Sequence, residues 1–216
     1  MKFRSLYMLG AFAAFSLAAC SSQSSEVTDV LSEEAKAGSE EVQEALEARE
    51  ATVATAAAVL ESRSGTDVTG IVTFTEIELR AGDRVDEQRV VVGSQLQGLP
   101  PGEARGVHIH EFGDCSDDAA MNAGGHFNPA GTEHGGLHDD GAHAGDLGNI
   151  VADDDGNASG SITVSVDKIS VAGDAPNNVV GKSVIVHVAQ DDYVSQPTGD
   201  AGPRAACGVI APVERD

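Results

Sequence analysis

Six of the seven histidines of this 216-residue chain lie in one stretch, residues 108–146. The stretch is also rich in glycine and aspartate, and the seventh histidine, His187, follows in an apolar segment. Imidazoles and carboxylates at this density are typical of a metal site and not of a packed core. We therefore expect a fold that brings His187 back to this stretch.

The first group of candidate ligands lies on predicted strands. His108 and His110 are two residues apart, so in a strand their side chains point to the same face, with Val107 and Ile109 on the other. His187, in the run VIVHV, could meet them from a neighbouring strand. Three or four imidazoles without a thiolate suit Cu(II) or Zn(II).

The second group lies in glycine-rich loop sequence, which is flexible enough to fold around one ion. Its members are His126, His134, His143 and Asp146. Three imidazoles and one carboxylate make a closed tetrahedral set, which is typical of structural zinc.

The remainder of the chain predicts short strands and turns. Tryptophan is absent, aromatic residues make up 4%, and valine and threonine alternate with polar residues. The predicted strands are residues 68–75, 89–96, 105–110, 147–151, 158–166 and 184–188, with turns at 81–87 and 153–157. Residues 51–62 fit a helix by alanine content and a strand by alternation. We expect an all-β sandwich or barrel with two long loops, about 111–146 and 189–206, which are long enough to be functional.

The N-terminus predicts export. Lys2 and Arg4 precede an apolar stretch, Leu6 to Leu17, that has the length of a signal peptide and is short for a membrane span. The run Leu-Ala-Ala-Cys ending at Cys20 resembles the lipobox of bacterial lipoproteins. It implies a signal peptide over 1–19 and a lipid on the sulfur of Cys20. The alternative is an ordinary signal peptide with an incidental cysteine.

Residues 20–50 predict a linker between the lipid and a domain spanning 51–216. The segment is rich in serine, glutamate and alanine, which fits a solvated helical or disordered stalk. A short coiled coil that dimerises the protein is the alternative, because apolar residues recur at heptad-like spacing. Its seam would contain Val42, Leu46, Arg49, Val53, Ala56 and Leu60. Arg49 on the seam favours the stalk.

Net charge excludes one class of partner. The formal charge is −22, and removal of Lys2 and Arg4 with a signal peptide changes it to −24. So acidic a chain does not bind nucleic acid or anionic lipid by electrostatic attraction. Cys115 and Cys207 would remain as an even pair in an oxidising compartment, which suggests a disulfide.

Five sequence blocks in chain order carry a family resemblance: GVHIHEFGDC, AGGHFNP, HGGLHDDGAHAGDLGNI, HVAQDD and AGPRAACGVI. Together they resemble the copper–zinc superoxide dismutases, particularly the exported bacterial ones. The resemblance covers residues 54–212. It implies an eight-stranded Greek-key β-barrel of immunoglobulin-like sandwich type, and it favours a strand for residues 51–62.

The resemblance also implies a role for each site residue. The implied copper ligands are His108, His110, His126 and His187, and the implied zinc ligands are His126, His134, His143 and Asp146, with one copper and one zinc per subunit. His126 would bridge the two metals and carry a proton, and Arg204 would attract the substrate anion. Asp191 would link a copper histidine to a zinc histidine, Cys115 would pair with Cys207, and His138 would be a surface residue.

The implied activity is dismutation of superoxide to O₂ and H₂O₂ by a Cu(II)/Cu(I) cycle. With the predicted lipid anchor, it places the protein on the periplasmic side of a bacterial cell envelope, as a monomer or homodimer. The alternatives are a copper- or zinc-sequestering lipoprotein on the same fold, and a partner-binding lipoprotein with a relic domain. The complete ligand set and Arg204 exceed what storage needs. One departure concerns the loop 189–203, which has no lysine or arginine before Arg204.

Overall fold

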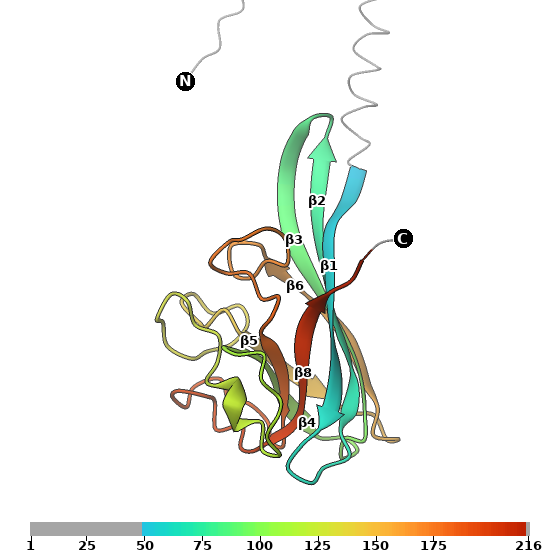
Figure 1. The fold of residues 1–216 in the computed structure, drawn as a ribbon, viewed down its shortest axis with the longest axis vertical. Coiled ribbons are helices and arrows are strands. Elements are labelled where there is room, and N and C mark those ends of the chain that lie inside the picture. The colour runs from blue at the N-terminus through green and yellow to red at the C-terminus, as the bar shows by residue number, and fades with distance from the viewer. Residues whose placement is uncertain (1–48, 215–216) are drawn as a thin grey trace, which may run out of the picture. The chain divides into compact units, whose positions relative to one another are not determined.

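The computed structural model of the chain describes residues 49–214, which form β-strands joined by turns and three long loops (Figure 1). The only helix in this range is a single 3₁₀ turn, η1 (Met121–Ala123). The strands are β1 (Arg49–Ser62), β2 (Thr69–Ala81), β3 (Arg84–Gln97), β4 (Ala104–His110), β5 (Asp146–Val151), β6 (Ala158–Ser165), β7 (Ser183–His187) and β8 (Arg204–Pro212). The long loops cover residues 111–145, 166–182 and 188–203. The first and the last were expected, although the last ends before Arg204 and not at residue 206, and the loop 166–182 was not predicted.

The eight strands form one antiparallel sheet in the order β5-β4-β7-β8-β1-β2-β3-β6. The neighbours β4–β7, β8–β1 and β3–β6 are not consecutive in the chain, so the connections cross between strands. The two end strands, β5 and β6, also contact each other, so the sheet curls into a nearly closed barrel. The expected all-β, eight-stranded barrel is confirmed.

The barrel interior is filled by one face of each strand. Val72 and Phe74 of β2 are fully buried, while Ile71 and Thr73, which alternate with them, are partly exposed. In β4 the side chains Val107 and Ile109 join this core. Because side chains alternate along a strand, His108 and His110 are left on the outer face of the barrel.

The β2–β3 hairpin is longer than predicted and, with the start of β1 paired beside it, projects beyond the remaining strands (Figure 1). The predicted turn over 81–87 is too long, because only Gly82 and Asp83 separate the strands. Gly82 has φ 59°, a left-handed conformation that glycine adopts without strain. The polar side chains pair along or across the ribbon: Arg84 pairs with Asp86 at 2.5 Å, and Gln88 Nε2 donates to Glu78 Oε1 at 2.6 Å. Charge in this segment therefore marks a solvated hairpin and not a turn.

Residues 51–62, whose sequence fitted a helix or a strand, belong to strand β1, which pairs with both β2 and β8. It begins at Arg49, so the last two residues of the expected stalk belong to the barrel. The coiled-coil seam is wrong for the positions from Arg49 to Leu60, which lie in this strand. Residues 1–48, with the predicted signal peptide, Cys20 and most of the stalk, lie outside the described residues. Within residues 49–214, the structure contains no helix long and apolar enough to span a membrane.

Candidate metal centre

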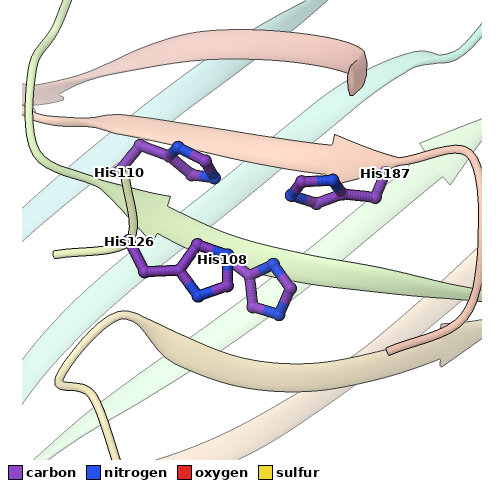
Figure 2. A group of neighbouring side chains, drawn as sticks. All are labelled: His108, His110, His126 and His187. Carbon is purple, nitrogen blue, oxygen red and sulfur yellow. The ribbon is translucent and has the colours of Figure 1, made fainter. Parts of the chain in front are cut away.

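Four imidazoles meet on the outer face of β4 and β7, as Figure 2 shows. His108 and His110 come from β4, His187 from the end of β7, and His126 from the loop 111–145, where it forms an isolated β-bridge with His110. One ligand atom from each of the four lies within 4.8 Å of the others, and all four residues are buried. We call this group the histidine quartet.

A second group shares His126 and contains His134, His143 and Asp146, again buried and within 4.8 Å of one another. We call it the mixed quartet. Asp146 Oδ1 lies 2.8 Å from His126 Nδ1, 3.1 Å from His134 Nδ1 and 3.3 Å from His143 Nδ1. Four ligands at about 2.0 Å from a tetrahedral ion would lie about 3.3 Å apart, so the spacing suits zinc. His138 is exposed and belongs to neither quartet, as predicted.

Six ring nitrogens in the two quartets are buried without a hydrogen-bond partner among residues 49–214. They are His108 Nδ1, His110 Nε2, His126 Nε2, His187 Nε2, His134 Nδ1 and His143 Nδ1. The last two lie near Asp146 Oδ1 but not in the direction of a hydrogen bond. Buried polar atoms are normally satisfied, and each one left unsatisfied destabilises the fold by about 1–3 kcal/mol. Metal ions would satisfy all six.

The opposite nitrogen of two histidines is fixed by a main-chain carbonyl. His110 Nδ1–H donates to Gly124 O and His187 Nδ1–H donates to Gly202 O, both at 3.0 Å. A proton held on Nδ1 leaves the lone pair on Nε2, so each ring presents its unbonded nitrogen to the histidine quartet. In this way the loops set the tautomer of both ligands.

Asp191 joins the two quartets through one fully buried carboxylate. Its Oδ2 lies 2.8 Å from His108 Nε2, and its Oδ1 lies 2.9 Å from His134 Nε2. Asn149 of β5 holds the main chain of Asp191: Asn149 Nδ2 donates to Asp191 O and Asp191 N donates to Asn149 Oδ1, both at 2.9 Å. The sequence predicted the position of Asp191 but not the role of Asn149, for which it carries no local signal.

Burial keeps three imidazoles of the histidine quartet neutral. It lowers the pKa of His108 to about 4 and that of His187 to about 3, and it lowers the pKa of His110 well below its usual value. Burial favours protonation of Asp146, but hydrogen bonds from His126 and the Gly135 N–H outweigh it and lower this pKa to about 2. These four side chains are therefore in their metal-binding protonation states at neutral pH.

Arg204 begins β8, opposite His187 in the sheet register. Its guanidinium donates to Ala120 O, and to Gly124 O at 2.6 Å, and Gly124 O also accepts from the His110 ring. The guanidinium therefore lies beside the histidine quartet.

The guanidinium of Arg204 has no salt-bridge partner among the described residues, and Asp117 is the carboxylate that acts on its charge from farther away. The other described arginine side chains each pair with a carboxylate two positions away; they are Arg63, Arg80, Arg84, Arg89 and Arg105. Within residues 49–214, Arg204 is the one arginine whose described side chain has no carboxylate within salt-bridge distance.

The disulfide between Cys115 and Cys207 is formed, with Cα atoms 5.7 Å apart. It ties the loop 111–145 to β8 close to Arg204. Arg63, which the sequence did not single out, holds the same loop: its Nε and Nη2 donate to Cys115 O at 3.1 and 2.8 Å. The disulfide and the hydrogen bonds from Arg63 together fix the loop segment whose carbonyls accept from Arg204.

A family model described as "Copper/zinc superoxide dismutase (SODC)" matches residues 68–210. The chain belongs to the copper/zinc superoxide dismutase family. A superoxide dismutase [Cu-Zn] of Saccharomyces cerevisiae is 40% identical over 159 residues, which are 71% of this chain and 94% of the yeast protein. One from Candida glabrata is 41% identical over 159 residues, 71% of this chain and 96% of that protein. Among solved structures, the clock protein EA4 aligns with TM-score 0.62 and 37% identity, covering 76% of this chain and 97% of EA4.

Membership of this family makes the chain an enzyme of the superoxide dismutase class with copper and zinc as its cofactors. The two quartets fit these cofactors. Four imidazoles suit copper, and three imidazoles with one carboxylate suit zinc.

Proposed function

We propose that this chain dismutates superoxide with copper at the histidine quartet and zinc at the mixed quartet, as a lipoprotein of a bacterial cell envelope. The observation that carries the site assignment is the position of His126. Its Nδ1 lies 2.8 Å from Asp146 Oδ1 in the mixed quartet, and its Nε2 is buried without a hydrogen-bond partner among the described residues. A neutral imidazole keeps a proton on one nitrogen, so His126 would have to lose this proton to hold copper and zinc at the same time.

Copper, when bound, supplies the one-electron cycle that oxidises one superoxide to O₂ and reduces a second, while zinc is redox-inert. The side chains of the protein transfer protons and hold the ligand rings in position. Two superoxide anions and two protons give one O₂ and one H₂O₂. His126 Nε2 can hold a proton in one half of the cycle and release it to the product in the other. Asp191 and the carbonyls of Gly124 and Gly202 keep the rings of His108, His110 and His187 in one orientation, so the cycle needs little rearrangement.

Arg204 attracts the anionic substrate over a short range. The loop 188–203 carries exposed acidic residues, Asp192 and Asp200, and no lysine or arginine. The whole chain has a formal charge of −22, so its long-range field repels superoxide. The guanidinium of Arg204 therefore supplies the attraction that remains within a Debye length, about 8 Å at physiological salt.

Export and anchoring are supported by the N-terminal sequence. Lys2 and Arg4 before an apolar stretch, and Cys20 after two alanines, favour cleavage before Cys20 and lipid attachment to it. Residues 20–48 would then connect the lipid to β1, and the enzyme would meet superoxide arising outside the cytoplasm, as a monomer or a homodimer. Mass spectrometry of the mature protein tests this: absence of an acyl group on Cys20 would refute the anchor.

The decisive experiment measures superoxide consumption by the mature protein after its copper and zinc contents have been verified. We expect rapid second-order decay, loss of it in His126→Ala, and full retention in His138→Ala, because His138 is exposed and outside both quartets. A fully metallated protein without activity would refute the enzymatic assignment and favour metal sequestration.

A further inference from the structure

The side chain of Gln196 forms a cyclic hydrogen-bonded pair with the main chain of His134. Gln196 Oε1 accepts from His134 N–H and Gln196 Nε2 donates to His134 O, both at 2.8 Å. The two residues are 62 positions apart, one in the loop 188–203 and the other in the loop 111–145. One primary amide thus occupies both hydrogen-bonding groups of one residue, as a neighbouring strand would.

The loops 111–145 and 188–203 are joined at His134. In the described part of the chain, every hydrogen bond between these loops involves this residue: two link its main chain to Gln196, and one links its ring to Asp191. The ring contact also involves the histidine quartet, because the same carboxylate binds His108. The contact from Gln196 acts on the mixed quartet alone.

The segment that carries Gln196 is held by its own hydrogen bonds. Asp192 accepts from Val194 N at 2.9 Å and from Ser195 N at 2.8 Å. The turn is closed by Asp192 N to Gly199 O at 2.9 Å and Gly199 N to Ser195 O at 2.7 Å. None of these bonds involves a metal ligand, so the amide of Gln196 is presented to His134 before any metal binds.

We propose that Gln196 is a positioning residue for zinc. It fixes the main chain of His134, while Asp191 fixes its ring at Nε2, so that Nδ1 faces the mixed quartet in the metal-free protein. The loop that leads to Arg204 is thereby attached to the zinc side of the site. Loss of the amide leaves the copper ligands untouched and frees one zinc ligand, so its effect is selective for zinc.

The test compares Gln196→Met with Val194→Ala in the mature, disulfide-intact, metal-free protein. Methionine keeps the length of the side chain without its donor and acceptor, and Val194 is an exposed side chain of the same turn. Zinc and copper affinities are measured separately by competition with a chromophoric chelator. We expect zinc affinity to fall about 10- to 100-fold in Gln196→Met, the range seen when a residue that orients a ligand is lost. Copper affinity, and both affinities in Val194→Ala, should stay within about threefold of the wild type.

Amide hydrogen exchange without metal gives a second readout. The His134 N–H, which Gln196 accepts, should be protected in the wild type and exchange about tenfold faster in Gln196→Met. The Gly145 N–H, bonded to Phe127 O in the same loop, should be unchanged and so reports that the variant is folded.

Zinc binding within twofold of wild type, equal weakening of both metals, or unchanged exchange at His134 would each overturn the proposal. The inference rests on the assignment of zinc to the mixed quartet. That assignment is tested first and separately by zinc binding to the wild-type protein and to His143→Ala.

Discussion

Replacing Arg204 by alanine should slow the reaction with superoxide at least about tenfold. Arg204 is the guanidinium without a salt-bridge partner among the described arginine side chains, and it lies against the carbonyl that orients His110. Two unit charges about 6 Å apart interact by about 1.4 kcal/mol at an effective dielectric constant of about 40, between the values for water and for a protein surface. A change of that size in the transition-state free energy is a factor of about ten in rate.

The second-order rate constant should be measured by pulse radiolysis on proteins of equal metal content, at low and at physiological ionic strength. Salt screens the long-range repulsion by the acidic chain in both proteins, but it also weakens the local attraction to Arg204 in the wild type alone. Added salt should therefore raise the rate of Arg204→Ala more than the rate of the wild type.

Two controls separate the charge of Arg204 from its hydrogen bonds and from net charge. Arg204→Lys keeps the charge and should recover most of the rate. Arg84→Ala removes one cation from the tip of the β2–β3 hairpin, where Arg84 pairs with Asp86 at 2.5 Å, and should remain within twofold of wild type. The reasoning would be refuted by an Arg204→Ala rate within twofold of wild type, or by a lysine variant as slow as the alanine variant.

Three further predictions concern stability. Cys207→Ser opens a disulfide with a sequence separation of 92 and should lower the free energy of unfolding by about 4–5 kcal/mol in the chain-entropy model, as measured in urea; a loss below about 1 kcal/mol would contradict it. Burial lowers the pKa of His108 to about 4 and of His187 to about 3, so in acid the unfolded chain binds more protons. The metal-free protein should therefore lose about 1.4 kcal/mol per pH unit for each of them below about pH 6.5, and a flat profile from pH 7.5 to 5 would exclude this. Gly199→Ala places a Cβ against Asp191 Oδ1 at φ 67°, and calorimetry should show a lower melting temperature with and without metals; an unchanged Tm would show that the loop adapts.

The ligands were predictable because strand alternation and family blocks both constrain them. The two-residue spacing of His108 and His110 places them on one face of the strand. Val107 and Ile109 alternate with them and lie in the core, so the histidines must lie on the outer face. β8 was found only through the resemblance. Its residues from Ala205 to Gly208 are buried without alternation, because the disulfide loop covers the outer side of this strand.

The side chains that hold the site together escaped the sequence analysis. Asn149, Gln196 and Arg63 each bind main-chain atoms 42, 62 and 52 positions away. Such contacts depend on the closed tertiary structure, and no local pattern marks an amide or guanidinium that will make one. The strand ends predicted around residue 83 were wrong for a related reason. Pairing across the hairpin overrides the preference of charged residues for turns.

Sharing Asp191 and His126 between the quartets has a thermodynamic consequence. Two ions that draw on common side chains cannot bind independently, and the coupling between them must be reciprocal. Whatever factor zinc adds to the affinity for copper, copper adds to the affinity for zinc. A shortage of either metal in the cell would therefore change the protein's affinity for the other, and the metal supply of one quartet becomes a control on the occupancy of its neighbour.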